Sequence, residues 1–297
     1  SVGGGRTVAE GQAAWRAAAA AAKASGATTA KVVALTGGPC AGKSTALAFL
    51  SDQLSRRGAD VITCPEAATL VMSNGVRPPT APGVACAWQS LMLSTMLAME
   101  DNYKEWAALQ ATARVLGGRP PRPSVVVCDR GALDGKSFVE PAVWAAVLEE
   151  RGKTTEELQA RYDLVVHLVT AAIGAADHYE AGDGALSNPA RFHSAAQAAD
   201  VDRATLAAWE GHPALVRVDN STGFARKVVR VLTPICALVG LPRPREVTVT
   251  VTVREIERAA LPVPVEDVRI TIVGLHALAH ASSRSSSAEG DVAGEGA

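Results

Sequence analysis

The chain has 297 residues, a formal net charge of −1 and 48% hydrophobic residues. This length suits one large domain with a sizeable core. The near-neutral charge argues against a general attraction to nucleic acids or membrane surfaces, so any affinity for phosphate must be local. No apolar run approaches the roughly 20 residues of a membrane-spanning helix. The five cysteines form no C-x-x-C pair, so we expect reduced thiols and a cytoplasmic protein rather than a zinc or disulfide framework.

An Ala-rich helix is predicted over residues 8–24, ended by Gly26, within an N-terminal extension of residues 1–30. The nucleotide-binding domain is expected to span 31–243. Beyond it, residues 246–254 alternate apolar and polar side chains, so 244–280 is interpreted as a β-rich fragment of a truncated second domain. The Ser/Gly/Ala-rich stretch 281–297 is predicted to be disordered.

The most specific pattern lies in residues 31–45. Residues 32–35 form an apolar run typical of a buried parallel strand, and helical spacing of leucines follows residue 44. Between them is G-x-x-x-x-G-K-S, whose backbone N–H groups cradle phosphates. Lys43 is expected to reach the β- and γ-phosphates, and the Ser44 hydroxyl to bind Mg²⁺. The predicted phosphate-binding residues are Gly37, Gly38, Pro39, Cys40, Ala41, Gly42, Lys43, Ser44 and Thr45.

Further strands and helices alternate along the chain, which predicts an α/β fold: a P-loop NTPase (kinase-like) parallel sheet with helices on both faces. The predicted strands are 60–64, 124–128, 164–170 and 215–218, and the main helices are 84–116, 141–150, 197–210 and a last one reaching about residue 238. Pro234 is expected to kink or break this last helix. In the long helix we expect core positions rather than a cofactor site for Trp88, Leu91, Met92, Met96, Leu97 and Met99.

Chemistry-bearing residues follow the predicted strands, where parallel sheets place their sites. Asp129 follows the apolar run 125–128 and is interpreted as a Walker B magnesium ligand, the alternative being a helix cap. The neighbouring Arg130 is expected to bind a transferred phosphoryl group, the alternative being a structural ion pair. Glu66 follows the second strand; it is a candidate base for a hydroxyl proton or, equally, an N-cap or surface residue.

Residues 171–193 form a candidate lid, the alternative being a flexible surface loop. Arg191 in this segment and Arg203 on the next helix are expected to close over phosphates and stabilise transition-state charge. Asn220 and Ser221, after the last strand, complete the predicted nucleotide-binding set. No asparagine begins an N-K-x-D motif, so a Ras-type switch is not expected and the choice between guanine and adenine stays open.

Several blocks in order resemble one P-loop family. They are Gly-Gly-Pro-Cys at 37–40, Pro-Glu-Ala-Ala-Thr at 65–69, Cys-Asp-Arg-Gly-Ala-Leu-Asp at 128–134, and the stretch from Trp209 through Gly-His-Pro to Asp-Asn-Ser-Thr at 219–222. The chain resembles, over about residues 31–243, the AAA-type nucleotide-binding domain shared by bacterial nicotinamide-riboside kinases of the NadR type and the eukaryotic TRPL translocation defect proteins. The eukaryotic branch looks closer.

This resemblance implies purine nucleotide binding, with GTP for the eukaryotic branch, and a link to phosphoinositides, trafficking proteins and the periphery of endomembranes. Members of that branch carry a second domain similar to the CYTH fold. Here Glu255 and Glu257 are followed by Ala259, so the E-x-E-x-K signature of that fold is absent.

The sequence thus predicts a Mg²⁺-dependent protein that binds GTP or ATP. Two functional classes remain: a regulatory or trafficking module with slow turnover, which the resemblance favours, and a small-molecule kinase that phosphorylates a nucleoside-like hydroxyl acceptor. The kinase interpretation needs Glu66 as base and Lys43 and Arg191 as phosphate clamps.

Overall fold

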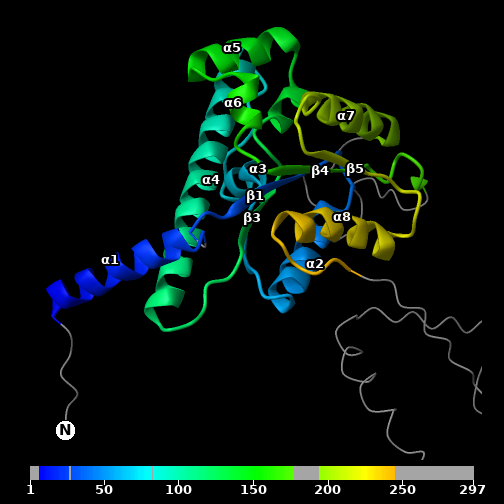
Figure 1. Ribbon diagram of the computed structural model, residues 1–297. Coiled ribbons are helices and arrows are strands. Elements are labelled where there is room, and N and C mark those ends of the chain that lie inside the picture. The colour runs from blue at the N-terminus through cyan, green and yellow to red at the C-terminus, as the bar shows by residue number, and fades with distance from the viewer. Residues whose placement is uncertain (1–6, 27, 82, 177–193, 245–297) are drawn as a thin grey trace, which may run out of the picture. The chain divides into compact units, whose positions relative to one another are not determined.

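Five parallel strands in the order β2-β3-β1-β4-β5 form the centre of the computed structural model, which describes residues 7–26, 28–81, 83–176 and 194–244 (Figure 1). The central strands β1, β3 and β4 consist almost wholly of buried residues, as expected for a sheet covered on both faces. The predicted α/β fold with a parallel sheet is confirmed. The strands are β1 (Lys31–Thr36), β2 (Asp60–Cys64), β3 (Ser124–Asp129), β4 (Leu164–Leu168) and β5 (Leu215–Val218).

Helices cover both faces of this sheet, and each face has its own hydrophobic core. The first core packs leucines of α2 and apolar residues of α8 under β1 and β4. The second joins α4, α5 and α6 to the opposite face and includes Trp144 and Trp209. The helices are α1 (Val8–Ala24), α2 (Lys43–Arg56), α3 (Ala67–Ser73), α4 (Ala85–Leu116), the 3-10 helix η1 (Asp134–Phe138), α5 (Pro141–Arg151), α6 (Thr155–Gln159), α7 (Ala195–Ala208) and α8 (Phe224–Leu238).

Local sequence signals explain several of these boundaries. Thr7 and Thr154 each form a capping box at the start of their helix, α1 and α6. Helix α1 packs against α4 and buries Ala18 and Ala22. Pro234 lies inside α8, which continues to Leu238, so the helix is not broken there.

The chain divides into two units, residues 1–243 and 244–297. Residues 177–193, which are most of the candidate lid 171–193, lie outside the described residues. The predicted β fragment beyond residue 244 and the predicted disordered tail also lie outside them. The five cysteines all lie in described stretches and form no disulfide; three are buried, whereas Cys40 and Cys86 are half-buried. No helix in the described stretches is long and apolar enough to cross a membrane.

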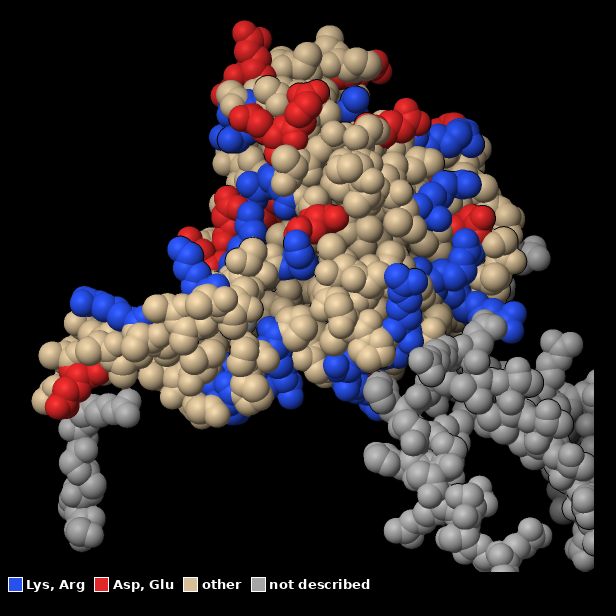
Figure 2. Space-filling model, in the orientation of Figure 1, with Lys and Arg blue, Asp and Glu red and all other residues tan. Residues whose placement is uncertain are grey.

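Side chains of both signs are dispersed over the face shown in Figure 2. Acidic groups gather towards the top of the view, where Figure 1 places α5, and basic groups are more frequent lower down.

The order of the strands brings the predicted site together. Strand β1 pairs with β3 from Lys31 opposite Val125 to Leu35 opposite Asp129. The loop that leaves β1 and the carboxylate that ends β3 therefore lie side by side at the carboxyl edge of the sheet.

Candidate functional site

The loop between β1 and α2 is shaped by close backbone contacts. Gly37 has a φ of 139°, and a Cβ there would lie 2.1 Å from the carbonyl oxygen of Leu168. Gly42, with a φ of 86°, is the N-cap of α2, and no side chain caps this helix. The first N–H groups of a helix lack intrahelical partners, so this loop presents donors suited to an anion.

Lys43 lies across the mouth of this loop. Its ammonium donates to the carbonyl oxygens of Gly37, at 2.9 Å, and of Gly38, at 3.1 Å. Burial and then Arg130 lower the pKa of Lys43 to about 8, while nearby carboxylates, Asp129 first, oppose this shift. The Lys43 ammonium is thus a buried positive charge at the phosphate loop, and a bound phosphate there would stabilise its charged form.

Arg130 links three parts of the site. Its guanidinium donates to Glu66, to Asp134 at 3.2 Å and to the carbonyl oxygen of Gly37 at 3.4 Å. The backbone at Arg130 is left-handed, with a φ of 73°. The structure therefore contains the ion pair that the sequence left as an alternative, and this ion pair holds the guanidinium beside the phosphate loop.

Glu66 is the other half of this pair, at the N-cap of α3, but its side chain does not cap the helix. It accepts hydrogen bonds from Arg130 and from the Thr69 hydroxyl. Burial raises the pKa of Glu66, but Arg130, Thr69 and Lys43 together outweigh burial and lower it. Glu66 is thus held ionised at the edge of the site, facing the loop rather than capping its own helix.

Asp134, for which the sequence suggested no role, supports this arrangement. It is 1% exposed and accepts hydrogen bonds from the Thr36 hydroxyl at 2.7 Å and the Trp209 indole at 2.8 Å, besides Arg130. Because Asp134 fixes both the end of β1 and Arg130, it is a positioning residue for the loop.

Asp129 is the candidate metal ligand. One of its carboxylate oxygens is buried without a hydrogen-bond partner among the described residues. Burial raises its pKa; Glu66 and Asp134 add to this rise, while Lys43 and Arg130 oppose it. A buried carboxylate that lacks a hydrogen-bond partner is a suitable ligand for a hard cation such as Mg²⁺. Asp129 also lies close to the loop whose N–H groups would bind phosphate.

The protein alone does not complete a metal site. The described residues contain no cluster of three or more His, Cys, Asp or Glu side chains that could hold an ion. Mg²⁺ commonly takes only one or two protein ligands and completes its shell with water and substrate phosphates. Asp129 and Ser44, which line the same cavity, therefore fit a magnesium ion that arrives with a nucleotide.

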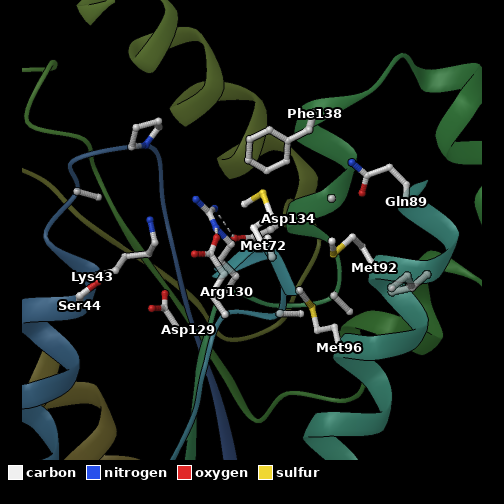
Figure 3. Close-up of a pocket in the computed structure, with 18 of the residues that line it drawn as sticks. Lys43, Ser44, Met72, Gln89, Met92, Met96, Asp129, Arg130, Asp134 and Phe138 are labelled. Carbon is white, nitrogen blue, oxygen red and sulfur yellow. Dashed lines mark hydrogen bonds and ion pairs between the residues drawn. The ribbon is translucent and has the colours of Figure 1, made fainter. Parts of the chain in front are cut away.

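A cavity of about 360 Å³ continues from the phosphate loop into the protein (Figure 3). Figure 3 shows Lys43, Ser44 and Asp129 on one side, Arg130 and Met72 between, and Met92, Met96 and Gln89 on the other side. The cavity thus has a charged end at the loop and a second end lined mainly by apolar side chains of α3, α4, η1 and α5, namely Met72, Trp88, Met92, Leu93, Met96, Phe138 and Trp144.

This cavity corrects part of the interpretation of α4. Leu97 and Met99 pack against the core as predicted. Leu91 is 63% exposed, so the core assignment for Leu91 is wrong. Trp88 and Met92 line the cavity, and Met96 both lines it and packs against the core. The helical spacing of apolar residues identified the inward face of α4. It could not show that part of this face lines a cavity instead of packing in the core.

A family model of an AAA domain matches residues 32–227, two thirds of the chain. The protein belongs to this AAA domain family. A search of proteins with curated descriptions found no significant match. The P-loop of an AAA domain implies nucleotide binding, in agreement with the glycine loop, the lysine and the adjacent carboxylate described above.

The AAA domain anchors its phosphate loop through a buried carboxylate on α7. Asp202 accepts hydrogen bonds from the backbone N–H groups of Gly38 and Thr170, both at 2.9 Å, and lies 3.2 Å from Nε2 of His167. Burial raises the pKa of Asp202, but His167 and the two N–H groups outweigh burial and lower it. A Cβ on Gly38 would lie 2.8 Å from Asp202 Cβ, so this contact requires a glycine.

We expect Asp202→Ala to destabilise the AAA domain by about 2–4 kcal/mol, because two buried N–H groups and His167 lose their acceptor. Asp200→Ala is the matched control on the same helix. Asp200 is 71% exposed, and Arg203 is its one ion-pair partner among the described residues, so its loss should change stability by less than about 0.5 kcal/mol. Urea unfolding of both variants measures the difference. Equal stability would show that Asp202 does not anchor the loop.

The remaining predicted nucleotide-binding residues lie at varied positions. Arg203 is 65% exposed and pairs with Asp200. The amide of Asn220 donates to the carbonyl oxygens of Thr170 and Ile173, while its oxygen accepts from Lys227. The hydroxyl of Ser221 donates to Asp219. Arg191 lies outside the described residues, and none of the other three lines the main cavity.

Lys227 joins Asn220 to the phosphate loop. Its buried ammonium also donates to the carbonyl oxygens of Ala41, at 3.1 Å, and Val169, at 2.7 Å. Neither this lysine nor Asp202 could be recognised from the sequence, since a charged residue within a helix pattern is usually solvent-exposed. Both act on the loop from the helices that follow β4 and β5.

Proposed function

We propose that the protein binds a purine nucleoside triphosphate with Mg²⁺ and transfers its terminal phosphoryl group to a hydroxyl of a small molecule in the cavity. The cavity supports this proposal, because it connects Lys43 and Asp129 to an apolar chamber deep enough for a second substrate. A module that only senses nucleotide has no need of such a chamber beside its γ-phosphate position.

The reaction assigns a role to each charged group. The acceptor hydroxyl oxygen forms a bond to the γ-phosphorus, the bond to the β–γ bridging oxygen breaks, and its electron pair leaves with the nucleoside diphosphate. Glu66 takes the hydroxyl proton, and Lys43 and Arg130 stabilise charge on the transferred group. Ser44 and Asp129 would hold magnesium, which would supply positive charge to the phosphate oxygens.

The regulatory interpretation rests on the resemblance to the TRPL translocation defect branch, which also suggests GTP, phosphoinositides and trafficking partners. We place it second, because the cavity has no role in it. The position of Glu66 also favours the kinase: its side chain faces Arg130 rather than capping α3.

The proposal is tested by measuring ATP and GTP consumption with Mg²⁺ in the presence of a panel of hydroxyl compounds. We expect at least one compound to raise consumption above the basal rate and to gain 80 mass units, which corresponds to one phosphoryl group, in roughly one-to-one proportion to the diphosphate formed. If no compound accelerates the consumption of ATP or GTP, the result would favour the regulatory module.

The metal assignment is tested with Asp129→Asn. The variant should lose affinity for Mg²⁺–nucleotide by about tenfold or more, because Asn is a weaker ligand for a hard cation. When EDTA removes the metal, calorimetry should show nearly the same nucleotide affinity for the variant and the unmodified protein. Equal losses with and without Mg²⁺ would instead assign Asp129 a structural role.

A further inference from the structure

We propose that the acceptor is an uncharged molecule that carries no phosphate or carboxylate, with a ring or other apolar body that packs on the methionines of the cavity. This inference rests on the proposed phosphoryl transfer and specifies its second substrate. It follows from the charges that line the cavity and from the side chains of its inner end.

Within the described stretches of the chain, the cavity has no spare positive charge. Lys43 and Arg130 are the only basic side chains among the described residues that line it. Lys43 is held at the phosphate loop, and Arg130 is already paired with Glu66 and Asp134. An anionic group on the acceptor would therefore find no free cation to bind.

Three carboxylates, Glu66, Asp129 and Asp134, line the same space. An acceptor that brings its own phosphate would meet them as well as the γ-phosphate of the nucleotide. Like charges brought together in a desolvated site cost several kcal/mol. The charge of the cavity thus selects against phosphorylated acceptors.

The inner end is suited to an apolar body. Three of the four methionines in the chain, Met72, Met92 and Met96, line it, together with aromatic and aliphatic side chains. Methionine is flexible and polarizable and makes favourable contacts with rings. Besides the indole N–H groups of its two tryptophans, the polar group at this end, among the described lining residues, is the uncharged amide of Gln89. Neither this amide nor the Trp144 indole forms a hydrogen bond within the described residues.

The size of the cavity agrees with a ring-sized acceptor. Gly135 in η1 keeps the inner end open, because a Cβ there would lie 3.0 Å from the Trp144 ring and 3.1 Å from Oε1 of Gln89. The hydroxyl that receives the phosphoryl group then faces Glu66 and Arg130, while the body lies between α3 and α4.

The test compares neutral alcohols with their phosphate monoesters. The probes are 2-naphthylmethanol, 2-phenylethanol and cyclohexylmethanol, each beside its monoester, titrated into the full chain saturated with Mg²⁺ and the β,γ-imido analogue of ATP or GTP. The analogue occupies the phosphate loop, so a monoester cannot bind there. Because Trp88 and Trp144 line the cavity, quenching of tryptophan fluorescence reports binding.

We expect at least one alcohol to bind about tenfold or more tightly than its monoester. Met92→Gln should lower the affinity for that alcohol by about fivefold, because part of an apolar contact is lost. Leu91→Gln, an adjacent exposed position, should not change the affinity. A monoester that binds as tightly as its alcohol, the failure of all alcohols to bind, or equal affinity in Met92→Gln would each overturn the inference.

Failure of the proposed function gives a different result. If the alcohols bind with this pattern but none is phosphorylated in the consumption assay, the cavity assignment stands and the kinase proposal fails. If a phosphorylated compound is the better acceptor, phosphoryl transfer stands and the neutral-acceptor inference fails.

Discussion

Lys43→Ala is expected to lower nucleotide affinity by at least about 100-fold while leaving the fold intact. Among the described residues, the Lys43 ammonium alone donates to two carbonyls of the loop, where phosphates would bind. A charge-assisted hydrogen bond contributes about 1.5–3 kcal/mol, and we expect the lysine to reach two phosphates of the bound nucleotide. Since burial already disfavours the charged form of Lys43, its removal should not lower stability.

Calorimetry with ATP and GTP, together with circular dichroism melting, measures both parts of this expectation. Lys31→Ala is the matched control: Lys31 begins β1, pairs with Asp163 and lies at the opposite end of the strand from the loop. The control should bind nucleotide as the unmodified protein does. Unchanged nucleotide affinity in Lys43→Ala would show that the glycine loop is not the nucleotide-binding site.

Glu66→Gln should reduce phosphoryl transfer by about 10²–10⁴-fold, the usual size of a general-base effect, with a change in nucleotide affinity of only a few fold. The substitution keeps the size and polarity of the side chain, so Thr69 and Arg130 retain a hydrogen-bond acceptor. The lowered pKa of Glu66 keeps the carboxylate ionised at neutral pH, so the side chain is free of a proton when the acceptor hydroxyl arrives.

Glu149→Gln on the exposed side of α5 is the control, and its turnover should match that of the unmodified protein. Steady-state rates with a fixed acceptor separate the possibilities. A large fall in affinity with normal turnover would mean that Glu66 acts only by holding Arg130. Basal hydrolysis that is slow and indifferent to the substitution would support a regulatory module.

Much of the sheet could be predicted because its signals are local. Each strand is a short apolar run followed by a turn, and parallel strands align their carboxyl ends. The glycine loop and Asp129 were therefore correctly expected to be neighbours, and the register of β1 with β3 brings them together. The capping boxes at Thr7 and Thr154 likewise depend only on residues three positions apart.

The supporting residues could not be predicted, because their roles depend on contacts between distant segments. Asp202 is 164 positions from Gly38, and Lys227 is 186 positions from Ala41. Both are charged residues within helix patterns, where the sequence alone indicates a solvated face. The cavity had no sequence signal for the same reason: the spacing of Met92 and Met96 is equally typical of a filled core.

The most direct measurement follows the γ-phosphoryl group itself. The protein is incubated with Mg²⁺ and ATP or GTP labelled at the γ-phosphorus, in the presence of a small-molecule extract, and the labelled products are separated. Our account predicts that the label enters an organic phosphate monoester, and that Lys43→Ala abolishes this transfer. Label released only as inorganic phosphate, or not released at all, would contradict the assignment of phosphoryl transfer to the cavity.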